Sequence, residues 1–126
     1  MLFAKDPKAV VLSETYERNM YGTKSQWFVT PGNRYAIIAI LCYDGMVLAC
    51  VMRDNGEPGF LPIAAFEPAH TKLEPDWSIR VFPCGWVVIG PKFMTESEDS
   101  YNKVLEGDVG KRAELNAYLR SIRGYP

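Results

Sequence analysis

Three carboxylates and one histidine are the residues whose types and spacing could support chemistry. Glu67, His70, Glu74 and Asp76 lie in a polar, proline-bounded segment of the chain. Two neighbouring carboxylates can act as general acid and general base, because the charge of one raises the pKa of the other. Polar loops normally lie solvated on the surface, which is the favoured interpretation of this segment. A small enzyme that uses these four residues stays open as an alternative.

Other catalytic and metal-binding patterns are missing from the sequence. His70 is the single histidine, and no serine stands in a Gly-x-Ser-x-Gly turn. The segment from Gly85 to Gly90 lacks the Gly-Lys-Ser/Thr ending of a phosphate-binding loop. No two cysteines have the close spacing of zinc ligands among Cys42, Cys50 and Cys84. We therefore assign no catalytic residue and expect no metal and no cofactor.

Aromatic and acidic side chains give the sequence its clearest binding features. Aromatic residues make up 13% of the chain, and small barrels often present such side chains near their loops. Core packing is the commoner role of an aromatic ring, but two phenylalanines beside predicted turns are expected to be exposed. Acidic residues in the first turn of a predicted helix stabilise its dipole, or else form an acidic patch. The predicted binding residues are Phe60, Phe82, Glu67, Asp76, Glu96 and Asp99.

The elements that position these residues are organised around a hairpin in the segment 34–66. Asp44-Gly45 separates two apolar runs, and this residue pair favours a type I′ turn between antiparallel strands. The turn sets a register in which Tyr43 pairs with Met46.

The same register pairs Ile37 with Met52, and it leaves both faces of the hairpin apolar. A sheet with one solvated face would alternate apolar with polar residues, so we expect both faces to be covered. A second turn at 54–56 leads into a short run from Phe60 to Ile63. Pro62 marks that run as an edge strand, because proline cannot donate to a neighbouring strand.

The N-terminal part of the sequence predicts less regular structure. Asp6-Pro7 resembles a helix N-cap followed by proline, which favours a helix over 7–20. A strand over 9–12 is the alternative. The aromatic and β-branched run 26–30 predicts a strand. Pro31-Gly32 then predicts a tight turn into the hairpin.

Two further strands and two helices complete the predicted order. Trp77, Ile79 and Val81 alternate with polar residues and predict a half-buried strand with these three side chains inward. Residues 86–89 form another apolar strand.

A helical pattern then begins at Thr95, where Thr95 and Glu98 form a capping box. Gly107 ends this helix, Asp108 caps a second one, and Gly124 ends that.

Composition and charge narrow the class of protein. The 126 residues suit one domain, with a β core over 27–90 and a helical segment over 95–123. A net charge of −1 without a basic cluster argues against nucleic-acid binding. The sequence shows no signal peptide and no apolar run of about 18 residues, so we expect no membrane partner. Three unclustered cysteines predict reduced thiols and a cytoplasmic protein.

The predicted fold class is α+β: a mainly antiparallel small barrel or curled sheet with C-terminal helices. Several turn and core positions resemble those of an SH3-like barrel, in which a glycine turn leads into a strand and a proline-containing edge strand follows. These positions are Thr30-Pro31-Gly32, Tyr35, Asp44-Gly45, Asp54-Asn55-Gly56, Pro62 and Phe66-Glu67. The later Trp77, Ile89-Gly90-Pro91 and acidic helix resemble small uncharacterised bacterial proteins, some of which lie beside toxins and could act as immunity proteins. The resemblance covers roughly 27–120 and brings no catalytic residue to this chain.

Three functions follow from these observations. The first is a non-catalytic module that binds another protein, in an immunity-type or regulatory role. The second is a small enzyme that uses the loop carboxylates and His70. The third is a homodimer or larger homo-oligomer that pairs through an exposed strand edge near Phe60 to Ile63. The absence of catalytic patterns favours the first.

Overall fold

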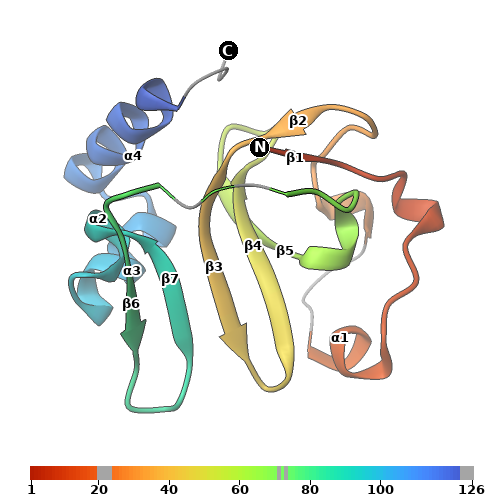
Figure 1. Cartoon of the computed structure of the whole chain (residues 1–126), viewed down its shortest axis with the longest axis horizontal. Helices are drawn as coiled ribbons and strands as arrows, with labels where there is room; N and C mark the ends of the chain where they lie inside the picture. The colour runs from red at the N-terminus through yellow and green to blue at the C-terminus, as the bar shows by residue number, and fades with distance from the viewer. Residues whose placement is uncertain (20–23, 71, 73, 123–126) are drawn as a thin grey trace.

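The computed structural model describes residues 1–19, 24–70, 72 and 74–122, and these residues form an α+β fold (Figure 1). The expected class, a mainly antiparallel fold with C-terminal helices, is confirmed. The elements in chain order are β1 (Leu2–Phe3), the 3₁₀ helix η1 (Pro7–Ala9), α1 (Glu14–Asn19), η2 (Lys24–Gln26), β2 (Arg34–Tyr35), β3 (Ile37–Tyr43), β4 (Met46–Met52), β5 (Pro58–Pro62), η3 (Ile63–Ala65), β6 (Trp77–Val81), β7 (Val87–Pro91), α2 (Lys92–Thr95), α3 (Glu98–Glu106) and α4 (Val109–Ser121).

Five strands form one antiparallel sheet in the order β5-β4-β3-β7-β6, and β1 pairs with β2 separately. The expected edge strand is β5, which begins and ends with proline and follows the turn at 54–56. The other edge is β6. No pairing joins β5 to β6 in the described part of the chain, so the sheet is open. The closed barrel that the resemblance implied is therefore not formed.

The central hairpin has the predicted turn. Asp44 and Gly45 both have positive φ, at 49° and 76°, as a type I′ turn requires. Tyr43 pairs with Met46 as predicted, and the register holds from there to Ala39.

The register then shifts between Ile37 and Ala39, which places Ile37 opposite Val51 and not Met52. The extra residue of such a bulge turns the next side chain to the other face. Ile38 accordingly packs with the helices, as its neighbour Ala39 does, and the pairing predicted for Ile37 is wrong.

Two hydrophobic clusters cover the two faces of the hairpin, as expected, except near its turn, where Val47 is exposed. On one face, Leu41 and Val88 pack against Met94 and Leu115 from α2 and α4. On the opposite face, buried residues of β4 and β5 pack against the N-terminal segment, which contributes Trp27. In Figure 1 the helices α2–α4 lie beside β6 and β7, and the N-terminal segment with α1 lies on the side of β4 and β5.

The N-terminal segment is less helical than the sequence predicted. Asp6 does cap a helix, because its carboxylate accepts the Lys8 N–H at 3.0 Å. That helix is a short 3₁₀ turn, and the chain runs irregularly before α1, so one helix over 7–20 is wrong. Residue 20 lies outside the described residues.

The predicted strand over 26–30 is also wrong. Phe28 has φ of 54°, a left-handed conformation that a strand does not accommodate. Trp27 is buried in the N-terminal cluster and Thr30 donates its N–H to the Tyr35 hydroxyl at 2.7 Å, so tertiary contacts override the local preference. The predicted turn at Pro31-Gly32 is confirmed, with Gly32 at φ of 81°.

The start of the first long C-terminal helix differs from the prediction. Thr95 is the last residue of α2, and its hydroxyl lies 2.6 Å from that of Ser78. Ser97 caps α3 instead by accepting the Ser100 N–H at 2.9 Å. The capping box at Thr95 is therefore wrong by two positions.

The other predicted helix boundaries are in place. Gly107 ends α3 in the left-handed conformation, with φ of 80°. Asp108 caps α4 by accepting the Lys111 N–H at 3.1 Å. The predicted stop at Gly124 lies outside the described residues.

Candidate functional site

The two phenylalanines predicted to bind a partner pack inside the fold. Phe82 is buried, at 5% exposure, and its ring meets that of Tyr101 edge-to-face with centroids 5.3 Å apart. Phe60 is half-buried, 6.0 Å from the same ring. The predicted exposure of Phe82 is wrong, because the chain turns at Pro83 to Gly85 and leaves the ring beneath α3.

The predicted acidic residues of the C-terminal helices are exposed and form ion pairs. Glu96 Oε1 lies 2.6 Å from Lys111 Nζ, and this hydrogen bond and charge hold the pKa of the carboxyl below its usual range. Asp99 lies 3.2 Å from Lys103 one turn along α3. The Glu96–Lys111 pair connects the end of α2 to α4, and the Asp99–Lys103 pair lies within α3, so both acidic residues have a structural role without a ligand.

Glu67 and His70 are not gathered around the two depressions that Glu74 and Asp76 line in the described part of the chain. Glu67, His70, Glu74 and Asp76 are all exposed. Glu74 lines a small cavity, and neither Glu67 nor His70 contributes to it. Asp76 lines a different, wide-open groove of about 380 Å³. The groove is lined by Asp76, Lys92, Phe93, Glu96, Glu114 and Ala117.

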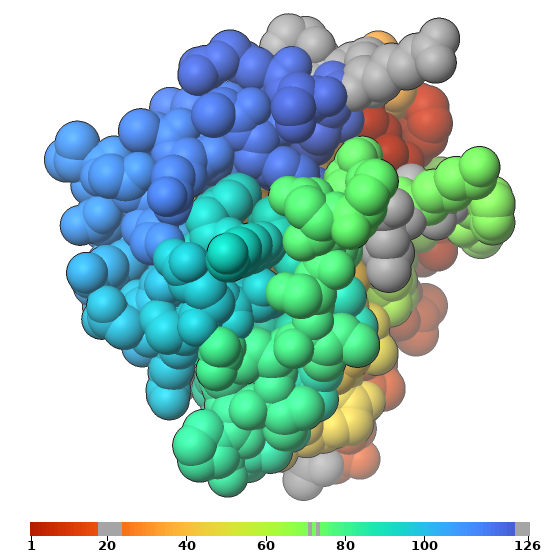
Figure 2. All heavy atoms as spheres, turned by 60° about the vertical axis from the view of Figure 1, so that its left-hand side comes forward, coloured from red at the N-terminus to blue at the C-terminus, as the bar shows by residue number. Residues whose placement is uncertain are grey.

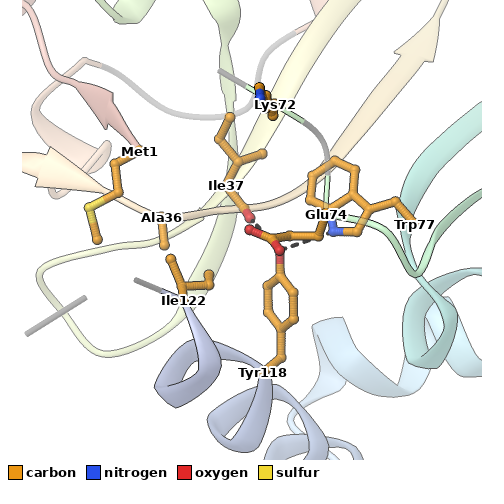
Figure 3. A pocket seen from close by; sticks show the side chains of 8 residues that line it. All are labelled: Met1, Ala36, Ile37, Lys72, Glu74, Trp77, Tyr118 and Ile122. Atoms are coloured by element: carbon orange, nitrogen blue, oxygen red, sulfur yellow. Dashed lines mark hydrogen bonds between the residues drawn. The ribbon is translucent and has the colours of Figure 1, made fainter. Parts of the chain in front are cut away.

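The small cavity lies between α4 and the starts of β3 and β6 (Figure 3). Its volume is about 40 Å³, which is room for water but not for an organic substrate. The hydroxyl of Tyr118 points into it, accepts the Trp77 indole N–H at 3.0 Å and donates to the Ile37 carbonyl at 3.2 Å. Burial raises the pKa of Tyr118 to about 12, so the hydroxyl is neutral at ordinary pH. The hydroxyl connects α4 to the sheet. Its raised pKa does not suit a general acid or base, whose pKa lies near the pH at which it works.

A third region was not predicted from the sequence: an apolar sheet face that no element covers fully. Its most exposed members are Ile79 and Val81 of β6, at 66% and 65%, with Val47 at 38%. Large apolar side chains that gather on one surface mark interaction sites in soluble proteins.

Strand register places these side chains in two rows across the sheet. One row runs Ile79, Ile89, Ile40 from β6 through β7 to β3. The second row consists of Val81, Val87, Cys42 and Val47, the last from β4. We call these seven residues the open sheet face.

The prediction for β6 gave the right strand and the half-buried position of Trp77, but the facing of Ile79 and Val81 is wrong. Ser78 and Arg80 point toward the helices, where the Arg80 guanidinium donates to the carbonyls of Thr95 and Glu96. The free carbonyls at a helix end attract a cation, and this contact turns the alternate residues Ile79 and Val81 outward. The alternation over 77–81 was the available signal, but it does not say which side is covered.

The described residues contain no feature of a metal centre or of a membrane span. Among the described residues, no group of three or more histidine, cysteine, aspartate or glutamate side chains is placed to hold a metal ion. None of the helices in the described ranges has both the length and the apolar character needed to cross a membrane. No family model, curated protein or solved structure matches the chain.

Proposed function

We propose that the chain is a non-catalytic module that binds another protein through the open sheet face. The observation that carries this proposal is the exposure of Ile79 and Val81, which end two apolar rows at the edge strand β6. Burying apolar surface contributes about 25 cal/mol for each Å² removed from water, so such a face favours association. An immunity-type or regulatory protein would act in this way, by covering a surface of the protein it binds.

The surroundings of the carboxylates support a binding role over catalysis. Glu74 and Asp76 line different depressions, and the cavity beside Glu74 has a volume of only about 40 Å³. General acid–base catalysis needs both groups within hydrogen-bond reach of one substrate. A binding role needs no such convergence.

The proposal is tested by capture of a partner from the native host. We expect the wild-type chain to retain a partner that Ile79→Lys and Val81→Lys lose, because a buried ammonium group would be unpaired in the interface. Val109→Lys is the matched control, since Val109 is 86% exposed on α4 and lies outside the open sheet face. The purified partner should then bind the wild type and the control with equal affinity. Loss in all three variants, or retention in all three, would contradict the proposed surface.

A further inference from the structure

The outer edge of β6 has main-chain groups free to pair with another strand. The Phe82 N–H donates to the Trp86 carbonyl at 2.8 Å, which fixes the residues that face β7. Main-chain groups alternate along an antiparallel strand, so the N–H and C=O of Ile79 and Val81 point away from β7. No described residue donates to them or accepts from them on that side. Figure 2 shows β6 (green) at the surface beside the helices.

The open sheet face indicates which side chains an added strand would present. The row through Ile79 and the row through Val81 both end at β6. Side chains of a strand point alternately to the two faces, so a sixth strand with apolar residues at alternate positions would extend both rows.

Charge at one end of β6 gives the added strand a direction. Glu74 and Asp76 lie just before the strand, both exposed, and neither carboxylate forms a salt bridge with another described residue. A lysine or arginine at the corresponding end of the added strand would complement them.

A second copy of this chain lacks that complement. If Ile79 pairs with Val81 of the copy, so that all free groups are used, the symmetry axis passes through Arg80. Each Arg80 then lies directly opposite the copy's Arg80, and like charges opposite one another are destabilising. The same register places Cys84 of the copy opposite Asp76, so no lysine or arginine lies there. A different protein therefore suits this edge better.

The opposite edge of the sheet is less suited to strand addition. β5 begins at Pro58 and ends at Pro62, and neither residue has an N–H to donate. Proline in an edge strand opposes pairing with further strands.

We propose that the partner adds an extended segment to β6 as an antiparallel sixth strand, with β-branched apolar residues at alternate positions and a lysine or arginine beside Glu74 and Asp76. This inference rests on the proposed function, because it specifies how the same surface binds. Antiparallel pairing is chosen because it is the more stable arrangement and matches the rest of the sheet. The basic residue then lies toward the carboxyl end of the partner segment.

The test uses a synthetic probe and the whole ¹⁵N-labelled chain. The probe is a peptide with valine and isoleucine at alternate positions, threonine between them and two lysines at its carboxyl end. We expect the amide signals of Ile79 and Val81 to shift on titration and their hydrogen exchange to slow. Absence of binding, or shifts confined to another surface, would overturn the proposal. Concentration-dependent shifts of the same signals without peptide would replace it with self-pairing.

Two peptide controls isolate the main-chain bonds and the charge. N-methylation of the amides that face β6 should weaken binding at least about tenfold, since two or more hydrogen bonds are lost. N-methylation of the alternate amides, which face away, should have little effect. Replacing both lysines with glutamate should weaken binding to the wild type and restore it in the double variant Glu74→Lys with Asp76→Lys. Equal binding of the two N-methylated peptides would overturn strand addition without any protein variant.

The protein variants separate this inference from the proposed function. Val81→Pro removes one outward N–H and leaves the pairing with β7 intact, and proline is tolerated at a strand edge. Loss of the native partner in Val81→Pro supports strand addition. A partner lost in Ile79→Lys but retained by Val81→Pro would keep the binding module and reject the added strand. A partner retained by both variants would reject the proposed function as well.

Discussion

The indole N–H of Trp77 donates a hydrogen bond to the hydroxyl of Tyr118 at 3.0 Å, which connects the start of β6 to α4. The same hydroxyl donates to the carbonyl of Ile37 at the start of β3, at 3.2 Å. One side-chain oxygen thus joins two strands of the sheet to the last described helix (Figure 3). This contact fixes the position from which β6 enters the sheet, and so the placement of Ile79 and Val81.

We expect Tyr118→Phe to destabilise the fold by about 1–3 kcal/mol, because it leaves an indole N–H and a carbonyl without their shared partner. Urea unfolding measures the change. Asn116→Ala is a control, since Asn116 is exposed on the same helix and should change the free energy of unfolding little. Equal stability of Tyr118→Phe and the wild type would mean that water replaces the hydroxyl.

The buried tyrosines predict a loss of stability in alkali. Burial raises the pKa of Tyr118 to about 12, and burial also raises the pKa of Tyr101. A tyrosine in the unfolded chain ionises near pH 10, so above that pH the unfolded state releases protons that the folded state retains. Stability should therefore fall as pH rises from about 10 to 12. Urea midpoints measured across this range should fall less steeply for Tyr118→Phe than for the wild type, and parallel curves would contradict the assignment.

Two glycines should respond oppositely to the same substitution. Gly45 has φ of 76° in the hairpin turn, and a Cβ there meets no atom within 4 Å, so Gly45→Ala should cost about 1–2 kcal/mol through backbone strain alone. Gly110 lies in α4 without positive φ, and Gly110→Ala should stabilise by about 0.5–1 kcal/mol. Thermal or urea unfolding measures both, and neither should alter partner affinity. Loss of binding in a folded Gly45→Ala variant would place the functional surface at the hairpin turn.

Local signals account for the parts of the fold that the sequence predicted well. The Asp44-Gly45 turn, the glycine stop at Gly107 and the Asp108 cap each depend on residues within one turn of the chain. The bulge beside Ile38 has no such local signal, because an extra residue in a strand is specified by what both faces must bury. Trp27 and Phe28 similarly follow tertiary contacts over their preference for a strand.

The candidate site was harder to predict because a period of two identifies a strand but not its buried face. Ile79 and Val81 of β6 were expected inside, and Phe82, the residue after the strand, was expected outside; each is on the other side. The contact of Arg80 with the end of α2 decides which side chains of β6 face outward, and that contact joins residues about 15 positions apart. A sequence pattern alone does not show it.

Phe82 is buried and Ile79 is exposed, which is the reverse of the prediction, so variants of these two residues can be compared directly. Phe82→Ala should destabilise the fold by about 3–5 kcal/mol, because it leaves a cavity against Tyr101 in the hydrophobic cluster between the sheet and the helices. Ile79→Ala should leave stability within about 0.5 kcal/mol, since the side chain is 66% exposed, yet it should weaken partner binding. Urea unfolding and binding to the purified partner, measured on both variants, separate the two roles. A strongly destabilised Ile79→Ala together with a Phe82→Ala that is stable but unable to bind would return the binding role to the phenylalanine predicted from the sequence.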